Sequence, residues 1–468
     1  MALPTIPITP QPTELVETRW RRIVTPLPAP ESLPLLECLR QVEPRSLSGM
    51  PPVVWDNAEG FLVRDPYGNQ WIDLTSGIVM ANAGHGHPKI RAAIRQMCDR
   101  PLLGTYIFPQ QARLPLLDKL VQLSPIPESK AILFSAGTEA TECAMMLMRR
   151  HGQRIHRDKV GIVSFAGGYH GRTLGAWLAT GSPGPEDWID RESVCHYQIP
   201  FPFTPRWAWG DVAKDPTGEQ AFAQCVDEMN RRGITPDKIA GFIGESAPGW
   251  ATCPIPHGFA AALIEWAREH QIVVCFDEVQ CGCGRTGRMW GMEHVGVVPD
   301  LFTAGKGLSS SLPVSAVVGR AVILDDPEAG DMSSTHGGNP VCAAAALACL
   351  QVLEEENLVE AAAATGKLVL ESLGELSEQF PDRILSIHGP GLFIGVHIKD
   401  SQTGEPDAEL ADAIVLEAIR RGVLMFVTGR GFLKFTPPLG IDPEAALEAA
   451  EVIKASFRDC VGEKEGLG

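Results

Sequence analysis

The chain has 468 residues, with 40 basic and 57 acidic side chains and a formal net charge of −17. Hydrophobic residues make up 44% and charged residues 21%, which is ordinary for a folded globular protein and argues against disorder as its main state. The acidic balance argues against a protein that binds nucleic acid or anionic membranes, because phosphate contacts need a basic face.

The first fifty residues are rich in proline and contain one short predicted helix, at residues 31–42. The N-terminus lacks a basic stretch followed by an apolar core, so we expect no signal peptide. No apolar run approaches the roughly 20 residues that cross a bilayer. Twelve cysteines are too few for a disulfide scaffold in a chain of this length. These features predict a cytoplasmic protein with reduced thiols and an N-terminal arm.

Strand-like stretches at residues 61–64 and 70–74 flank a turn-forming segment, so the sequence predicts a hairpin there. From about residue 85 to 345, short apolar runs alternate with helical patterns. Such alternation is typical of an α/β fold with a mostly parallel sheet covered by helices. The expected strands are residues 131–134, 161–165, 239–243, 272–276 and 315–319, and the expected helices are 139–150, 218–231 and 257–270.

The pattern changes after a predicted Ala-rich helix near residues 341–355. We therefore predict an N-terminal arm and hairpin over 1–84, a large α/β domain over 85–345, and a C-terminal α+β part over 346–468. The hairpin is expected to join the C-terminal part in one small domain. The later strands are expected at 392–398, 423–426 and 432–435, and the later helices at 407–421 and 443–457.

Ligands of open α/β sheets bind at the carboxyl ends of the strands, and three strand ends carry chemical groups here. In FSAGTEA, the N–H groups of Gly137, Thr138 and Glu139 at a helix N-terminus would hold an anion such as phosphate. In FDEVQ, a buried strand delivers Asp277 and Glu278 to the edge of the sheet. A carboxylate there needs a cationic partner, and a protonated heterocyclic nitrogen would be one.

In LFTAGKG, Lys306 lies in a small-residue turn after a strand and is a candidate to form a Schiff base. Taken singly, the three segments have ordinary interpretations: a helix N-cap, a structural salt bridge and a surface lysine. Taken together, a phosphate cradle, a carboxylate for a ring nitrogen and a lysine 29 residues after Asp277 describe pyridoxal 5'-phosphate (PLP).

These motifs resemble those of the class III (ω-type) aminotransferases, PLP enzymes of fold type I similar to the 4-aminobutyrate and ornithine aminotransferases. The resemblance runs from about Trp55 to Leu439. It implies a large domain with a mostly parallel seven-stranded sheet and a smaller α+β domain made from both chain ends. The matching motifs, in order, are DPYGNQWIDLTSGI, NAGHGHP, FSAGTEA, GGYHGRTLGA, the Glu245 region, FDEVQCGCGRTG, AGKG, THGGNP, GPGLFIGV and FTPPL.

The resemblance implies a role for each residue in the cofactor motifs. Lys306 forms the Schiff base with PLP and later carries the proton, while Asp277 pairs with the ring nitrogen. Val279 and Tyr169 pack on the two faces of the ring, and Gln280 hydrogen-bonds its phenolic oxygen. The residues implied to bind the phosphate are Gly137, Thr138 and, from the neighbouring subunit, Thr335. The active site is therefore expected in a homodimer, and the sequence leaves open whether dimers pair further.

The resemblance also implies how substrate carboxylates are held. Arg172 would bind one, because a guanidinium presents paired donors; a surface ion pair is its ordinary alternative. Glu245 would pair with an arginine when an ω-amino substrate is bound and release it when an α-keto acid binds. Ile78 and Met80 either line the substrate pocket or belong to the core of the hairpin.

Three positions depart from the family pattern. Lys434 stands ahead of the PPL motif where arginine is common, and a lysine cannot make a bidentate contact. Ser246 follows Glu245 in place of the usual proline, and Ala136 stands where a hydroxyl residue is common. The cofactor set is intact, while the set that selects the α-carboxylate is altered. The keto-acid acceptor therefore stays open between 2-oxoglutarate, pyruvate and others.

The sequence thus predicts an aminotransferase that moves an amino group from a carboxylate-bearing amino acid, such as 4-aminobutyrate, to a keto acid. An amino-acid racemase or epimerase, or a decarboxylating transaminase, would use the same site and stays open as an alternative. A non-catalytic scaffold is disfavoured because the whole cofactor set is present. We expect no metal ion at Cys281 and Cys283, since metal sites more often combine C-x-x-C pairs. The same holds for His85 and His87, which lie in a glycine turn.

Overall fold

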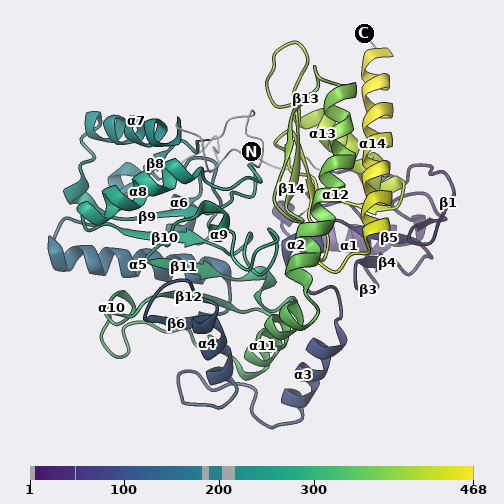
Figure 1. The fold of residues 1–468 in the computed structure, drawn as a ribbon. Coiled ribbons are helices and arrows are strands. Elements are labelled where there is room, and N and C mark those ends of the chain that lie inside the picture. Colours follow the sequence, from purple (N-terminus) through teal and green to yellow (C-terminus); the bar gives the residue numbers. More distant parts are fainter. Residues whose placement is uncertain (1–5, 48, 182–188, 203–216, 467–468) are drawn as a thin grey trace. The chain divides into compact units, whose positions relative to one another are not determined.

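A computed structural model describes residues 6–47, 49–181, 189–202 and 217–466. The chain divides into two compact units: a large unit, Pro88–Glu360, and a terminal unit made of Met1–His87 and Ala361–Gly468. The purple N-terminal and the yellow C-terminal segments of Figure 1 both belong to the terminal unit. The domain boundaries expected from the sequence, after residues 84 and 345, stay a prediction.

The large unit is built on a seven-stranded sheet in the order β6-β12-β11-β10-β9-β7-β8. Neighbouring strands are parallel except at β12, which runs antiparallel to both β6 and β11. The expected mostly parallel sheet is confirmed. Its strands are β6 (Ser129–Phe134), β7 (Gly161–Phe165), β8 (His196–Ile199), β9 (Ile239–Glu245), β10 (Val273–Asp277), β11 (Leu301–Ala304) and β12 (Ser315–Arg320).

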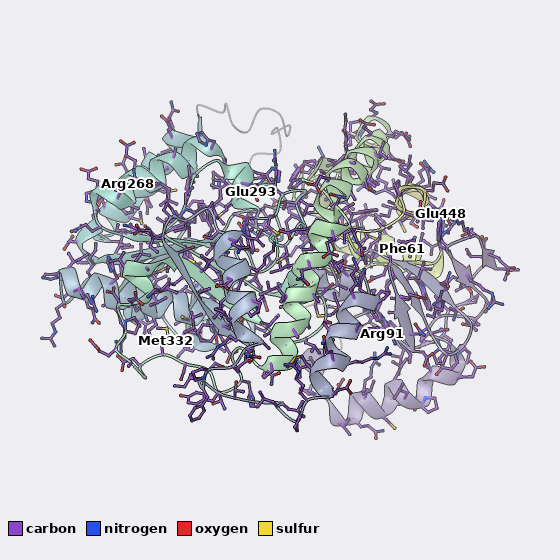
Figure 2. The ribbon with its side chains drawn as sticks, turned by 60° about the horizontal axis from the view of Figure 1, so that its bottom comes forward. Phe61, Arg91, Arg268, Glu293, Met332 and Glu448 are labelled. Atoms are coloured by element: carbon purple, nitrogen blue, oxygen red, sulfur yellow. The ribbon has the colours of Figure 1, made fainter. Side chains whose placement is uncertain are left out.

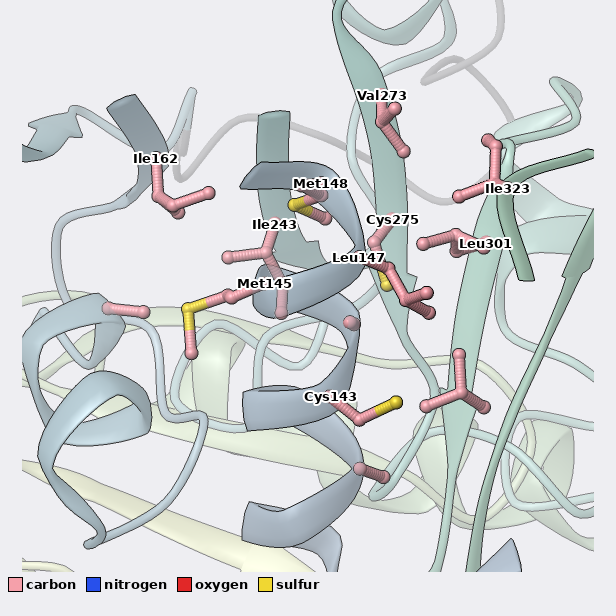
Figure 3. Close-up of a cluster of buried hydrophobic side chains, with 14 of the residues drawn as sticks. Cys143, Met145, Leu147, Met148, Ile162, Ile243, Val273, Cys275, Leu301 and Ile323 are labelled. Carbon is pink, nitrogen blue, oxygen red and sulfur yellow. The ribbon is translucent and has the colours of Figure 1, made fainter. Parts of the chain in front are cut away.

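Helix α5 (Gly137–Ile155) packs along strands β9 to β12 and forms much of the core. Gly241 on β9 permits this close packing, because a Cβ there would lie 2.3 Å from Met148 Sδ. The buried side chains that meet between α5 and the sheet include Cys143, Met145, Leu147, Met148, Ile243, Cys275 and Leu301 (Figure 3). Burying each of the larger side chains in this cluster stabilises the fold by about 1.5–3 kcal/mol.

The other helices of the large unit include α8, from which Arg268 extends into solvent, and α9, which carries the exposed Glu293 (Figure 2). The helix bounds are α3 (Pro88–Cys98), α4 (Arg113–Gln122), α6 (Leu174–Ala179), α7 (Thr217–Arg231), α8 (His257–Glu269), α9 (Met292–Val295), α10 (Ala321–Leu324) and α11 (Pro340–Glu355). Helix α12 (Leu358–Gln379) follows α11.

The terminal unit contains two smaller sheets. In the first, of order β1-β2-β5-β4-β3, strand β15 pairs in parallel with β5, so the N-terminal hairpin and a C-terminal strand share one sheet. The second is β13-β14-β16. The strands are β1 (Val16–Glu17), β2 (Arg22–Ile23), β3 (Asn57–Glu59), β4 (Leu62–Arg64), β5 (Gln70–Asp73), β13 (Ile384–His388), β14 (Ile394–Ile398), β15 (Val423–Leu424) and β16 (Phe432–Phe435). The helices are α1 (Leu33–Val42), α2 (Ser76–Val79), α13 (Ala408–Arg420) and α14 (Pro443–Gly466).

The hairpin expected at residues 61–74 is confirmed as the antiparallel pair β4 and β5. Strands β8 and β13 were not expected. β8, with the sequence HYQI, lies at the edge of the large sheet, where polar residues are tolerated and the apolar pattern is weak. Within the described residues, no helix is long and apolar enough to cross a membrane.

Candidate active site

The carboxyl ends of the large unit's strands surround a cavity of about 280 Å³, which we call the strand-end pocket. Open α/β sheets bind their ligands at this edge. The pocket is lined by Gly137, Thr138, Tyr169, His170, Gly171, Arg172, Glu245, Asp277, Val279, Gln280 and Lys306. Most of the large-unit residues expected at the site therefore meet in one place; Thr335, Glu139 and Glu278 do not line this pocket.

Asp277 is the last residue of the central strand β10 and is only 3% exposed. Its Oδ1 accepts hydrogen bonds from the Val279 N–H at 3.0 Å and the Thr303 hydroxyl at 2.9 Å. Its Oδ2 lies 2.7 Å from His170 Nδ1. A buried carboxylate is costly unless its oxygens are paired, and here both are.

Lys306 follows β11 and begins a short 3₁₀ turn, Lys306–Leu308, with a backbone φ of +35°. A non-glycine residue at positive φ is strained, and such strain is often found at functional sites. Burial lowers the pKa of the Lys306 amine, although Asp277 and Glu245 act in the opposite direction. The neutral amine, which is the nucleophile, is therefore more available than in a solvent-exposed lysine.

The first turn of α5 forms the expected anion cradle in part. The Glu139 side chain accepts from the Ser135 and Ala136 N–H groups, each at 2.8 Å. The Glu139 N–H donates to the Ala136 carbonyl at 3.0 Å, so the expectation that it faces an anion is wrong. Gly137 and Thr138, the first helical residues, keep the N–H groups that a helix start leaves without intrahelical partners. A Cβ on Gly137 would lie 2.8 Å from a Val279 methyl, so only glycine fits here.

The Thr138 hydroxyl takes part in a short chain of hydrogen bonds between α5 and α6. Its Oγ1 lies 2.6 Å from Thr173 Oγ1, and the Thr173 hydroxyl donates to Glu142 Oε1 at 2.6 Å. Because the single Thr173 proton goes to Glu142, the Thr138 hydroxyl is the donor in the first bond. Glu142 and Thr173 therefore fix the orientation of Thr138 in the pocket.

Tyr169 is 43% exposed, and its ring lies near two basic side chains. The Lys306 Nζ lies 6.0 Å and the Arg172 Cζ 5.8 Å from the ring centroid. The Tyr169 N–H donates to Glu245 Oε1 at 2.8 Å, while the Gly249 N–H donates to Glu245 Oε2 at 2.9 Å. Both oxygens of Glu245 thus hold backbone of the large unit, and burial raises the pKa of this carboxyl, with Asp277 adding to the effect.

Other predicted residues also lie outside the strand-end pocket. Thr335 is an exposed residue of the large unit. Ile78 and Lys434 belong to the terminal unit. Ile78 lies in a left-handed turn, has φ +67° and is 40% exposed, so the interpretation as hairpin core is wrong. Lys434 is buried on β16, with its Nζ 4.6 Å from the Phe393 ring centroid.

Two side chains take roles that the sequence did not reveal. His170, which is 3% exposed and lines the pocket, contacts the Asp277 carboxylate. Glu278, expected at the site, instead accepts from the Ser246 hydroxyl and from the Gly291 and Met292 N–H groups, at 2.5 to 2.8 Å. Burial raises the pKa of Glu278 to about 7, although these hydrogen bonds lower it in part.

A comparison with protein families identifies the chain. Residues 45–457 match the model of the aminotransferase class III family. The chain belongs to the class III aminotransferases. It is therefore an aminotransferase that acts on small amino and keto compounds, and its cofactor is pyridoxal 5'-phosphate.

Similar proteins agree with this membership. The chain is 32% identical to a 4-aminobutyrate aminotransferase of Mycobacterium leprae over 94% of this chain and 98% of the relative. It is 30% identical to an alanine/serine racemase of Pyrococcus horikoshii, over 95% of this chain and 94% of the relative. The solved structure of a PLP-bound amine transaminase from an uncultivated Pseudomonas species matches with a TM-score of 0.77 at 26% identity, over 87% of this chain and 95% of that one.

The strand-end pocket of this class III aminotransferase fits the cofactor through its own chemistry. The start of α5 suits a phosphate, because helix N-termini attract anions. The buried Asp277 carboxylate suits a protonated ring nitrogen, and the Lys306 amine suits an aldehyde. Because Gly137 lies close to Val279 and has no side chain, the first turn of α5 presents backbone where the phosphate would bind.

Proposed function

We propose that this class III aminotransferase takes the amino group of an ω-amino acid such as 4-aminobutyrate and passes it to a keto acid, 2-oxoglutarate or pyruvate. The observation that carries the proposal is the meeting of Lys306, Asp277 and Arg172 in one pocket. The 4-aminobutyrate aminotransferase of Mycobacterium leprae, similar over nearly the whole chain, supports the donor class.

When bound, PLP supplies a carbonyl that joins to amines and a ring that withdraws electrons. The Lys306 amine holds the cofactor and then moves a proton to and from the substrate carbon at its Nζ. The Asp277 carboxylate keeps a negative charge beside the ring nitrogen, which stabilises the protonated ring. Tyr169 and Val279 confine the ring, and Gln280 contributes a hydrogen bond at its oxygen. Gly137 and Thr138 bind the phosphate.

We assign the donor's carboxylate to Arg172, which lines the pocket and is exposed. R172A should raise the KM for 4-aminobutyrate about 10- to 100-fold, the usual worth of hydrogen bonds to a charged group, and leave the KM for butylamine within about threefold. The two donors differ only in the carboxylate, so the comparison isolates the role of the guanidinium. Equal losses for both would remove the assignment.

Thr335 is proposed to bind the phosphate of the partner subunit, which would make the homodimer the active unit. Mixing K306A with T335V protein tests this. Each variant alone should be nearly inactive at low PLP concentration. In a mixed dimer, one site would combine an intact Lys306 with the other subunit's intact Thr335, so activity should return to about half the wild-type value per dimer. An absence of recovery in verified mixed dimers would place Thr335 outside the partner's site.

Lys434 is proposed to contact a substrate carboxylate, and Ile78 to line the substrate pocket. Glu245 is proposed to pair with an arginine when an ω-amino substrate is bound and to release it when an α-keto acid binds. A lysine supplies a single point charge, whereas an arginine would supply paired hydrogen-bond donors. We therefore expect Lys434 to favour a small acceptor such as pyruvate over 2-oxoglutarate. K434R is therefore expected to improve the kcat/KM ratio for 2-oxoglutarate relative to pyruvate.

A single-turnover titration tests the proposed function. The PLP-loaded protein is mixed with ω- and α-amino acids without a keto acid, and the visible cofactor band and the carbonyl product are followed. An aminotransferase should lose the band and release one carbonyl product per site. The similarity to the alanine/serine racemase of Pyrococcus horikoshii supports racemisation as the second candidate. In that case the band would persist while an optically pure α-amino acid loses its optical purity.

A further inference from the structure

His170 is a buried histidine whose side chain touches the carboxylate of Asp277. Its Nδ1 lies 2.7 Å from Asp277 Oδ2, and the residue is 3% exposed. Its backbone is held separately: its N–H donates to the Thr180 hydroxyl at 2.9 Å, and its carbonyl accepts from the Thr141 hydroxyl at 2.8 Å. The ring is therefore not needed to anchor this segment of chain.

The hydrogen-bond partners decide which ring nitrogen carries the proton. A carboxylate only accepts, so Nδ1 must be the donor to Asp277. Among the described residues, the buried Nε2 has no hydrogen-bond partner. If Nε2 were also protonated, the ring would be a buried cation with one N–H group that has no acceptor. That state costs more free energy than a neutral ring whose Nε2 lone pair has no donor. The neutral form with hydrogen on Nδ1 fits this environment.

The acceptor capacity of Asp277 is nearly filled by the protein. A carboxylate offers about four acceptor directions. Val279 and Thr303 take two on Oδ1, and His170 takes one on Oδ2. One direction on Oδ2 remains. Since donors hold both oxygens, the carboxylate cannot rotate without breaking a bond.

We propose that His170 is a positioning residue, which fixes Asp277 so that the remaining lone pair of Oδ2 meets the ring nitrogen of PLP. This rests on the proposed role of Asp277. Val279 and Thr303 hold only Oδ1, so without His170 the second oxygen would be free to turn away. The charged groups that interact with this pair include Glu245 on the neighbouring strand and Lys306 in the pocket.

The test compares wild type, H170L and H170N as whole proteins loaded with PLP that is ¹⁵N-labelled in its ring. Leucine removes the donor at similar bulk, while asparagine places an amide N–H near the position of Nδ1. The ¹⁵N chemical shift reports the protonation of the ring nitrogen, and PLP affinity is measured in parallel. H170L should show a less protonated ring and about 10- to 100-fold weaker PLP binding, whereas H170N should restore the wild-type shift.

An identical ¹⁵N shift in wild type and H170L would overturn the role of His170. If wild type itself binds PLP with an unprotonated ring, the role of Asp277 fails instead, so the two failures are distinguishable. Thermal unfolding of each apoprotein reports whether it folds. If H170L does not fold, H170Q replaces it, because its amide lies farther along the side chain, near the position of Nε2.

Discussion

Replacing Lys306 with alanine should lower turnover by at least about 10³-fold and leave the protein unable to bind PLP covalently. Within the described chain, Lys306 is the only lysine that lines the strand-end pocket. Its pKa is lowered by burial, so a larger share of the amine is neutral and nucleophilic at working pH. No other group there joins the roles of nucleophile and proton carrier.

Two control variants test whether the loss of turnover is specific to the Lys306 amine. K306R keeps the positive charge but, because a guanidinium stays protonated, should be as inactive as K306A. K130A removes an exposed lysine paired with Asp325 and should keep turnover within about twofold. Borohydride reduction of the loaded protein, followed by peptide mass spectrometry, should place the PLP adduct at Lys306. An adduct on another lysine, or wild-type turnover by K306A, would refute the assignment.

The strand-end chemistry was predictable because parallel strands bring their carboxyl ends to one edge. Strands β10 and β11 are direct neighbours, with Asp277 opposite Thr303, so Lys306 just beyond β11 comes into the same pocket. The central strands of the sheet were also predictable, because burial on both faces produces continuous apolar runs in the sequence. An edge strand such as β8 lacks that signal.

The orientation of loop side chains was not predictable. Tyr169 and His170 lie between Gly167 and Gly171, which have φ of +84° and +139°, and Arg172 follows Gly171. No periodicity tells which side chain of such a loop is exposed in the pocket and which is buried against a neighbouring strand, so the contact of His170 with Asp277 was missed.

Glu278 shows a signal that was present but not used. Successive residues along an extended chain point to opposite sides, which argues against the expectation that Asp277 and Glu278 share a site. The structure places the Glu278 carboxylate against Ser246, Gly291 and Met292 instead. The family's usual proline has no hydroxyl, so Ser246 supplies a bond to Glu278 that the common pattern lacks.

Replacing Asp277 with asparagine should lower kcat by about 10²- to 10³-fold while PLP stays bound, because the loss falls on charge stabilisation in the ring. The amide is close in shape, and its oxygen can still accept from Val279 and Thr303. Its NH₂ group then occupies the position of Oδ2. That group donates hydrogen bonds and offers no acceptor lone pair to a protonated ring nitrogen. His170 would have to move its proton to Nε2, which has no partner among the described residues.

E278Q is the matched control for D277N, since it changes the next residue, an equally buried carboxylate outside the pocket. It should lower thermal stability, because the Glu278 oxygens hold two N–H groups and a hydroxyl, but it should leave kcat within about threefold and the ring protonated. D277N should show the reverse pattern: a large loss of kcat and an unprotonated ring in the ¹⁵N spectrum. If both variants lose kcat equally, the effect of D277N is structural. If only D277N loses it, Asp277 acts through its charge on the cofactor ring.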